Sequence, residues 1–330
     1  MDGHIPKVFG CNVNDEAIRA DSSSGGFFSL LAEDMFSKNG IVYGVTMSED
    51  CYSARYIRVT TREMLSSLRG SKYLQASIGD TFCKVKSDLD EGRAVLFSGT
   101  PCQVKGLKAF LEKDHDNLLC VDLICHGVPS GKLWESYLRY QEGKRKTKVI
   151  NVNYRCKKNS WGQYDLSCTD EKNKVIYSNK DDDIFMQMFL RNYALRETCY
   201  NCIAKASETS DIQMGDFWGV DIVAPELDDD KGSSLVIVRS DKGLATVNRM
   251  LERTHYVEIS YKQAIERNPA IIQSPERPLL RDCFYQDLDE MDFHSFADKY
   301  IHFSWRKKCK LFIKKTPIWN MVRYISRRVV

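Results

Sequence analysis

The sequence predicts an α/β fold: a mixed, partly parallel sheet flanked by helices, with an antiparallel β portion in the second half. Between residues 94 and 140, a short apolar strand, a tight loop and a helix occur twice in succession, and this alternation is typical of βαβ units. After Gly143, three short strand-like segments follow one another closely, as antiparallel strands do. The 330 residues are enough for one large domain or two ordinary ones.

The first part of the chain alternates between helical and strand patterns. Small residues at 22–26 precede apolar residues at helical spacing, which predicts a helix with a serine at its N-cap. The expected elements are a helix at 27–38, strands at 41–45 and 56–60, a polar helical stretch at 63–90, strands at 94–97 and 118–124, and helices at 104–111 and 132–140.

The second part begins after a soft boundary near Gly143. We expect strands at 149–154, 164–168, 175–177, 212–218 and 235–238, and helices at 183–195, 244–251 and 262–267. The predicted organisation is an N-terminal α/β part at 1–143, a C-terminal part at 144–300 packed on it, and a basic amphipathic tail at 301–330.

The composition is that of a globular protein, with 43 % hydrophobic and 28 % charged residues. No run of about 18 apolar residues occurs, so no transmembrane helix is expected. The first ten residues lack the apolar core of a secretory signal. We therefore expect a cytoplasmic protein.

The tail carries the positive charge of the chain. Nine Lys or Arg and no acidic residue lie between Arg306 and Arg328, leaving 39 basic and 45 acidic residues elsewhere. This distribution is not that of a general nucleic-acid binder, and we expect no nucleic-acid partner. Aromatic and aliphatic residues are interspersed in the tail. Three interpretations stay open: it covers the protein's own acidic body, docks on an acidic partner, or lies peripherally on the inner face of an anionic membrane.

The chain has twelve cysteines, which in a reducing compartment are better explained as metal ligands or buried thiols than as disulfides. The pair Cys199-x-x-Cys202 has three interpretations: half of a zinc site, half of a cluster site, or a redox dithiol. A predicted helix precedes the pair, whereas a thioredoxin-like dithiol opens a helix after a strand. The dithiol is therefore disfavoured.

Two thiolates complete neither a tetrahedral zinc site nor a four-iron cluster. Cys102 and Cys125 are the best further candidates, because each lies in a loop after a predicted strand and neighbouring parallel strands would bring these loops together. Cys120 lies inside an apolar strand and is interpreted as a core residue. Zinc and iron–sulfur both stay open, with the dispersed ligands favouring iron–sulfur.

Six short motifs occur in a specific order. They are Ser-Ser-Gly-Gly at 23–26, Gly-Ser-Lys-Tyr at 70–73, Gly-Thr-Pro-Cys-Gln at 99–103, Cys-His-Gly at 125–127, Cys-x-x-Cys at 199–202 and Gly-Asp-Phe-Trp-Gly at 215–219. In this order the chain resembles the coenzyme F420 hydrogenase/dehydrogenase beta subunit family, over residues 22–281. The resemblance implies a flavoprotein with an iron–sulfur cluster that passes electrons between the cluster, FAD and a substrate.

Carried over by motif, the resemblance implies a [4Fe-4S] cluster on Cys102, Cys125, Cys199 and Cys202. It also implies FAD contacts. A turn of Ser23, Ser24, Gly25 and Gly26 can hold a pyrophosphate with backbone N–H groups or can be an ordinary serine cap. The further candidates for flavin contact are Lys72, Thr100, Gln103 and His126. For His126, a role beside the cluster or as a proton donor is the alternative. No residue is a clear catalytic acid or base.

The chain departs from the family in two places. Many bacterial relatives carry a two-cluster ferredoxin module before the Ser-Ser-Gly-Gly motif, and this chain begins almost where such a module would end. We therefore expect electrons from a separate ferredoxin or other donor. Relatives also often have an arginine shortly before the position of Asp211, where this chain has Glu208, Thr209 and Ser210.

The resulting hypothesis is an iron–sulfur flavoprotein oxidoreductase or electron-transfer subunit that acts on an unidentified small-molecule substrate. The alternative is a zinc-stabilised or cofactor-free binding protein on the same fold.

Overall fold

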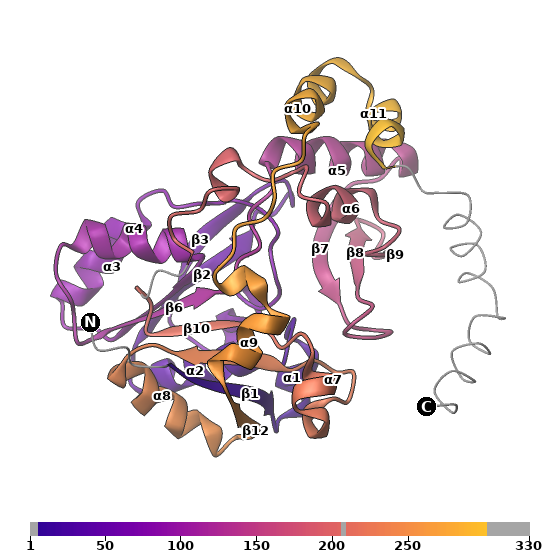
Figure 1. Cartoon of the computed structure of the whole chain (residues 1–330). Coiled ribbons are helices and arrows are strands. Elements are labelled where there is room, and N and C mark those ends of the chain that lie inside the picture. The colour runs from indigo at the N-terminus through magenta and orange to yellow at the C-terminus, as the bar shows by residue number, and fades with distance from the viewer. Residues whose placement is uncertain (1–5, 206–208, 302–330) are drawn as a thin grey trace.

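The computed structural model describes residues 6–205 and 209–301, and the basic tail predicted at 301–330 lies, after Ile301, outside this part. A nine-stranded sheet has the order β12-β1-β11-β10-β6-β5-β2-β3-β4, and a three-stranded antiparallel sheet has the order β7-β8-β9 (Figure 1). The large sheet consists of β1 (Lys7–Val13), β2 (Ile41–Met47), β3 (Ala54–Val59), β4 (Ala76–Ser77), β5 (Val95–Gly99), β6 (Leu118–Leu123), β10 (Ile212–Asp216), β11 (Ser234–Val238) and β12 (Thr254–Ile259). The small sheet consists of β7 (Val149–Cys156), β8 (Asp165–Asp170) and β9 (Val175–Asn179).

Four neighbouring strands of the large sheet, β2, β5, β6 and β10, are parallel. The other pairings are antiparallel, apart from the short β3–β4 pairing. The predicted mixed, partly parallel sheet and its separate antiparallel portion are thus confirmed. Because the four central strands are parallel, their carboxyl ends lie along one edge, where ligands bind in such sheets.

Helices cover both faces of the large sheet. One face packs on α2 (Phe27–Ser37) and α8 (Asp241–Leu251); the other packs on α3 (Thr81–Asp90), α4 (Pro101–Leu111) and α5 (Gly131–Arg145), and on α7 (Val220–Val223) and α9 (Tyr261–Arg267) beyond β10. Strand β6 shows the alternation that this requires, since Leu118 and Cys120 face one core and Leu119 and Val121 the other.

The small sheet packs on α5 and on α6 (Ile184–Leu190) through aromatic side chains. The ring of Trp134 lies 4.8 Å, between centroids, from both Tyr154 and Phe185, and all three residues are fully buried. The remaining helices are α1 (Glu16–Ala20), α10 (Arg281–Glu290), α11 (Phe293–Tyr300), η1 (Glu63–Ser67), η2 (Glu197–Cys199), η3 (Pro225–Leu227) and η4 (Pro269–Ile271). In the described ranges, no helix is both long and apolar enough to cross a bilayer.

Several elements differ from the sequence-based expectation. The N-cap of α2 is Gly26 with φ of 93°, not a serine, because this backbone conformation favours glycine. The polar stretch at 63–90 divides into η1, β4 and α3. Strands β1 and β12 and helices α10 and α11 were not expected, and the helix expected at 183–195 ends at Leu190.

Candidate functional site

The first cysteine of the site sits in the first turn of α4, directly after β5. A capping box fixes this turn. Thr100 is the N-cap, and Gln103 is the N3 residue whose side chain bonds back to the Thr100 backbone. The side-chain carbonyl of Gln103 accepts hydrogen bonds from Thr100 N (3.0 Å), Thr100 Oγ1 (3.0 Å) and Tyr56 Oη (2.9 Å). Thr100 Oγ1 also lies 3.2 Å from the exposed sulfur of Cys102. Thr100 and Gln103, which the sequence predicts to contact flavin, therefore hold the Cys102 loop in place.

Cys125 follows β6, the parallel neighbour of β5. Burial raises the pKa of Cys125 to about 12, Lys205 lowers it, and the charges of Cys102 and Cys199 raise it further. Burial likewise raises the pKa of Cys199, and Cys202 and Cys102 add to the increase. Charges on the neighbouring cysteines thus act on the thiols of Cys125 and Cys199.

The segment that carries the other two cysteines is tied down by polar contacts. Cys199 ends η2, and the N–H of Cys202 donates to Ser274 Oγ at 3.0 Å. The ammonium of Lys205 donates to the carbonyl oxygens of Cys125 and Ala270. Burial lowers the pKa of Lys205, whereas Cys125, Cys202 and Cys199 raise it. A cation therefore stands among the cysteine-bearing segments.

The side chains do not form a finished coordination sphere. In the part of the chain that the structure describes, no group of three or more His, Cys, Asp or Glu side chains is placed to hold a metal ion. Four thiolates nevertheless suit either a zinc ion or a four-iron cluster, and Lys205 supplies positive charge against them. The chemistry of the donor set suits such a centre, although the described side chains are not arranged as one.

A cavity of about 750 Å³ opens beside this edge of the sheet, within the size range of small-molecule and cofactor sites, about 300–1,000 Å³. Its lining includes residues of α1, of the segments at 21–23 and 69–72, of β7 and of the loop at 230–231. Seven basic and three acidic residues line it. The basic residues are Arg19, Arg69, Lys72, Arg155, Lys157, Lys158 and Lys231, and the acidic ones are Glu16, Asp21 and Asp230.

Arg155, near the end of β7, is the most buried cation of this wall, with a side chain 2 % exposed. Its Nη1 pairs with Asp216 Oδ2 at 2.9 Å, and its guanidinium lies 4.1 Å from the ring centroid of Tyr164 and 5.0 Å from that of Trp218. Its Nε and Nη2 atoms have no hydrogen-bond partner among the described residues. Arg155 is thus a buried positive charge behind the cavity wall, held between Asp216 and the rings of Tyr164 and Trp218.

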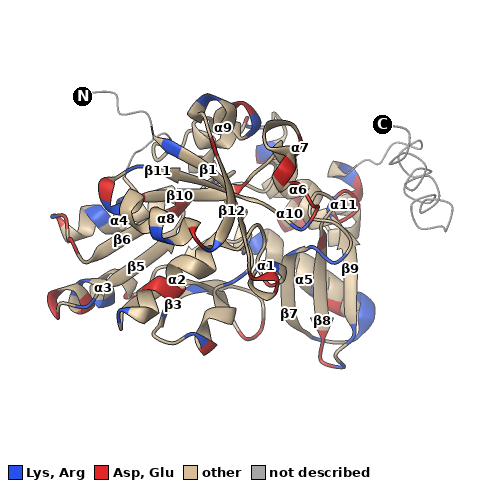
Figure 2. Ribbon diagram, turned by 90° about the horizontal axis from the view of Figure 1, so that it is seen from below, with Lys and Arg blue, Asp and Glu red and all other residues tan. Residues whose placement is uncertain are grey.

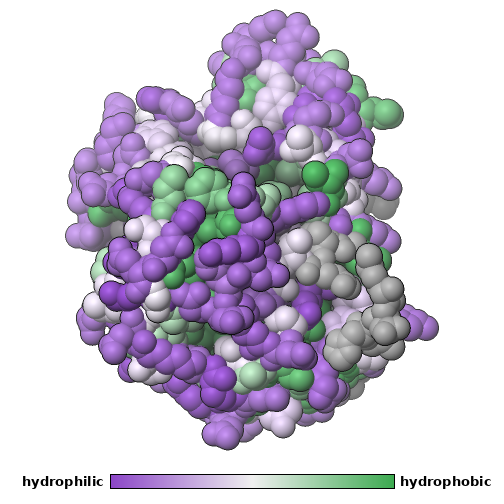
Figure 3. Space-filling view, turned by 90° about the vertical axis from the view of Figure 1, so that its left-hand side faces the viewer, coloured by the Kyte–Doolittle hydropathy of each residue, from purple (hydrophilic) through white to green (hydrophobic). Residues whose placement is uncertain are grey.

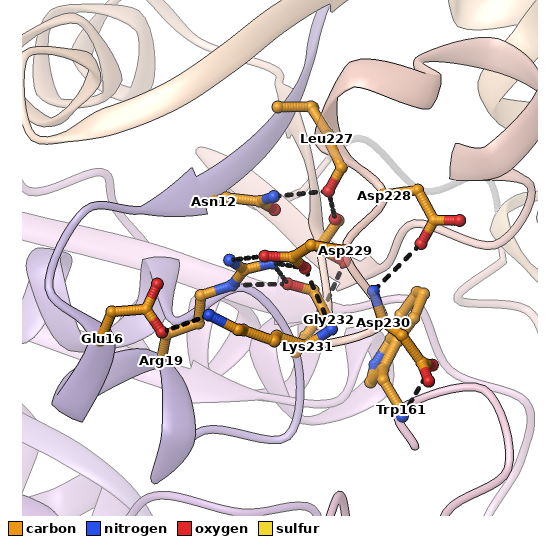
Figure 4. Close-up of polar contacts among 12 residues, drawn as sticks. Asn12, Glu16, Arg19, Trp161, Leu227, Asp228, Asp229, Asp230, Lys231 and Gly232 are labelled. Carbon is orange, nitrogen blue, oxygen red and sulfur yellow. Dashed lines mark hydrogen bonds and ion pairs between the residues drawn. The ribbon is translucent and has the colours of Figure 1, made fainter.

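A second wall joins α1 to the loop before β11 (Figure 4). Arg19 pairs with both carboxylate oxygens of Asp229, at 2.5 and 2.6 Å, and also donates to the carbonyl of Gly232. Lys231 pairs with Glu16 at 2.9 Å. These contacts hold the loop against α1. The carboxylates of Asp229 and Glu16 neutralise part of the positive charge of the cavity.

Lys157 continues the basic run after β7. Its ammonium donates to the carbonyl oxygens of Arg19, Ser24 and Lys231. Burial, followed by the charges of Arg19 and Arg155, lowers its pKa to about 8. Lys157 therefore links the small sheet to the Ser-Ser-Gly-Gly turn.

The predicted flavin residues fall into three groups. Ser23 and Lys72 line the cavity, and the N–H of Ser71 donates to Ser23 Oγ at 2.7 Å. The turn residues Ser24, Gly25 and Gly26 lie behind the lining, where Ser24 Oγ donates to Ser233 O at 2.6 Å. Thr100, Gln103 and His126 do not line the cavity.

Lys72 has a local structural contact as well. Its ammonium donates to the carbonyls of Ser67, Leu68 and Arg69 at the end of η1, and burial lowers its pKa to about 7.

Aromatic side chains lie between the cavity and the cysteines. Tyr73, which follows the lining residue Lys72, has its ring 4.8 Å from that of Phe189, and Phe189 lies 5.3 Å from the ring of His126, next to Cys125. His126 Nε2 is 2.7 Å from Asn192 Oδ1, and burial lowers the His126 pKa. The cavity and the cysteines are thus connected through packed rings.

Sequence reasoning missed Arg155, Lys157 and Arg19 as residues of the cavity. One signal was present, because 155–158 reads Arg-Cys-Lys-Lys at the end of a predicted strand. Basic residues at a strand end are common on surfaces, so the pattern alone does not distinguish a cavity wall from a solvated turn.

Two family descriptions match the chain, and both are of the coenzyme F420 hydrogenase/dehydrogenase beta subunit. The description of its N-terminal part matches residues 8–80, and the description of its C-terminal part matches residues 92–263. Among solved structures, a chain of the F420-reducing [NiFe] hydrogenase complex from Methanosarcina barkeri is similar, with a TM-score of 0.54 and 16 % identity. The match covers 92 % of this chain and 95 % of that chain, and at this identity it shows the fold alone. None of the curated proteins matches. The two family matches together span well over half of the sequence, and the chain therefore belongs to the coenzyme F420 hydrogenase/dehydrogenase beta subunit family.

Proposed function

We propose that this protein is an iron–sulfur flavoprotein oxidoreductase or electron-transfer subunit, with a [4Fe-4S] cluster on Cys102, Cys125, Cys199 and Cys202 and with FAD in the basic cavity. Membership of the family supports an oxidoreductase or electron-transfer role. The observation that carries the cofactor proposal is that Cys102 and Cys125 follow neighbouring parallel strands and lie near the segment of Cys199 and Cys202, while packed rings connect His126 to the cavity.

The cavity suits a ligand with negative groups. Its basic lining attracts phosphates, and Arg155 adds a buried positive charge to this wall. Ser23 and Lys72 stand at the same wall. When bound, the cluster supplies single electrons and the flavin exchanges them as pairs with a substrate.

The residues around the cysteines position these ligands. Thr100 and Gln103 hold the first turn of α4, while Lys205 holds the Cys125 loop and places a cation near the thiolates. An external donor must supply the electrons. A separate ferredoxin or a partner subunit is the proposed source, and the similar solved chain comes from a hydrogenase complex.

The first experiment is anaerobic purification of the protein with quantitation of iron, zinc and flavin. We expect a brown to yellow protein with about four irons. A colourless protein with one zinc would instead favour the alternative of a zinc-stabilised binding protein.

Serine substitutions test the ligand assignment. Replacing any one of Cys102, Cys125, Cys199 or Cys202 is expected to lower iron content sharply, because each contributes one ligand, and to reduce solubility. Cys120→Ser is the matched control, since Cys120 is fully buried in β6. Normal iron in Cys125→Ser combined with iron loss in Cys120→Ser would refute the assignment.

A further inference from the structure

Lys157 lies where four segments of the chain meet. It directly follows β7, and its ammonium donates to the carbonyl oxygens of Arg19 in α1 at 2.7 Å, of Ser24 in the turn at 22–26 at 3.0 Å, and of Lys231 in the loop before β11 at 2.8 Å. Arg19, Lys157 and Lys231 also line the basic cavity. One side chain therefore fixes how α1, the turn and the loop lie against the small sheet at the cavity wall.

The three contacts require the protonated form of Lys157. An ammonium has three donors and no acceptor, which matches three carbonyl oxygens, whereas a neutral amine has two donors and a lone pair. Loss of the proton would therefore leave one carbonyl without its donor, next to that lone pair. Carbonyl oxygens also lack the full negative charge of a carboxylate, so they hold the proton less firmly than an ion pair would. The arrangement of this wall thus depends on a group that can lose its charge.

Charged groups on the surrounding elements act on the protonation of Lys157. Burial is the largest cause that lowers its pKa, and the guanidinium groups of Arg19 and Arg155 lower it further. The carboxylates of Asp216 and Asp229 oppose them, and the resulting pKa is about 8. Lys157 therefore changes its charge not far above neutral pH. The other charged residues of these segments are Glu16, Asp21, Lys158, Asp228, Asp230 and Lys231.

An anion in the cavity favours the charged form of Lys157. Its negative groups would share the cavity with the ammonium and would raise the pKa of that group. By linkage, the protonated protein then binds the anion more tightly than the neutral form does, by the same factor. Figure 2 shows residues of both charges on and around α1, where other cations of this wall are already paired with carboxylates: Arg19 with Asp229 and Lys231 with Glu16. The charge on Lys157, which is bonded to carbonyls, is less neutralised than theirs.

We propose that Lys157 is a positioning residue through which the basic cavity takes up its anionic ligand together with one proton. The proposal rests on the proposed function, because FAD is the anion proposed for this cavity. The proton comes from solvent and binds to Nζ of Lys157, which restores the third carbonyl contact; no other bond is formed or broken. The wall then presents one more positive charge to the diphosphate of FAD, in the arrangement that the three contacts hold.

The test measures the affinity for FAD from about pH 6.5 to about pH 9.5, using the flavin fluorescence that appears when the purified full-length protein is diluted. In the wild type we expect the affinity to fall about tenfold as the pH rises through this range, because each unit by which FAD raises the pKa of Lys157 corresponds to a factor of about ten. Lys157→Arg keeps a charge that does not titrate in this range, so it should lose this fall. Lys157→Gln should bind FAD weakly throughout.

Three variants separate this effect from the loss of any other charge. Lys158, the next residue, also lines the cavity, but it is exposed and its ammonium lies 4.8 Å from the ring centroid of Tyr177. Lys158→Gln should weaken binding at every pH and keep the fall. Lys72→Arg should keep it too, since the pKa of Lys72, about 7, lies lower. Lys84→Gln, in α3 on the largely hydrophilic side of the molecule shown in Figure 3, removes a charge outside the cavity and should match the wild type.

A second readout needs no bound ligand. In an NMR titration of protein with isotope-labelled lysine, the resonance absent from Lys157→Arg should titrate near pH 8 and should move to higher pH when FAD is added. A midpoint at about 10.4, the ordinary value for lysine, would overturn the proposal, as would a pH profile of Lys157→Arg that matches the wild type. Wild-type protein that binds no FAD at any pH would instead refute the proposed function, so the two failures are distinguishable.

Discussion

Asp122 is a fully buried carboxyl group in the centre of the large sheet. It lies on β6, opposite Gln213 of β10 in the parallel register. Burial raises its pKa from 3.8 to about 7, against the opposing effects of Ser210, Arg239 and Gln213. The folded protein therefore retains a proton on Asp122 under conditions in which the unfolded chain has released it.

This proton links the stability of the fold to pH. Between about pH 4 and 7 the folded state binds more protons at this position, so the free energy of unfolding falls as pH rises, by at most about 1.4 kcal/mol per pH unit. The stability that this proton contributes is fully present below the pKa of the unfolded chain, 3.8, and is lost as the pH rises through the pKa of the folded protein, about 7. Asp122→Asn should remove it, and urea titrations from pH 5 to 8 should show the variant gaining stability relative to the wild type. Parallel pH profiles would contradict this assignment.

At the scale of single residues, the sequence predicts which side chains could be ligands better than it predicts which residues contact them. The four candidate cysteines follow from loop position and spacing, and contacts of Lys105 and Lys205 link the segments that carry them. The ammonium of Lys72, in contrast, is bonded to three carbonyls, which a motif does not reveal. Arg155 was missed because its pairing with Asp216 joins segments far apart in the sequence.

At the scale of elements, the turn before α2 is fixed by the two strands against which it packs. A Cβ atom on Gly25 would lie 2.3 Å from the carbonyl oxygen of Cys11 in β1 and 2.6 Å from the nitrogen of Ser234 in β11. Both neighbours are backbone atoms, so neither can move aside cheaply. The turn carries Ser23 into the cavity wall.

Gly25→Ala should therefore displace this turn. We expect a loss of about 1–3 kcal/mol in the free energy of unfolding, as for other overpacked sites, with reduced flavin content and unchanged iron. Gly143→Ala in α5 is the control, because no atom would lie within 4 Å of the added Cβ. It should stabilise the helix by about 0.5–1 kcal/mol. Full flavin occupancy in Gly25→Ala would argue against the role of the turn.

Elements with a clear hydrophobic pattern were predictable, and others were not. Strand β6 and helix α4 form where apolar residues predict them. Strand β1 is buried along almost its whole length, so it lacks the alternation that marks a half-exposed strand. Strand β12 is largely exposed at the sheet edge, and α10 has only two buried residues. Such segments carry little apolar signal.

At the scale of the molecule, the pair of Arg155 and Asp216 joins the small sheet to the large one. Its two side chains are 2 % and 19 % exposed, so removing one leaves the other poorly solvated. Arg155→Ala should cost about 3–5 kcal/mol of stability and should lower the affinity for the proposed flavin, because a positive charge leaves the cavity wall. The control is Arg139→Ala, at an exposed pair within α5, which should cost about 0.5 kcal/mol or less.

Urea unfolding with flavin release as a second signal would measure both effects. A stability loss in Arg155→Ala no larger than in the control would show that the pair does not hold the two sheets together.

The fold class could be predicted from the sequence because strand–loop–helix units predict parallel pairing from local pattern alone. The strand order could not, since β1 lies between β11 and β12, which follow it by more than two hundred residues. Nothing local indicates such long-range pairing.

The position of β1 has a consequence during synthesis. Its partners β11 and β12 leave the ribosome on the order of ten seconds or more after it, at about 5–20 residues per second. Until then its apolar side chains have no strand on either side, and a shorter delay separates Cys102 and Cys125 from Cys199 and Cys202. A nascent chain of this protein is therefore a natural client for chaperones that hold exposed strands.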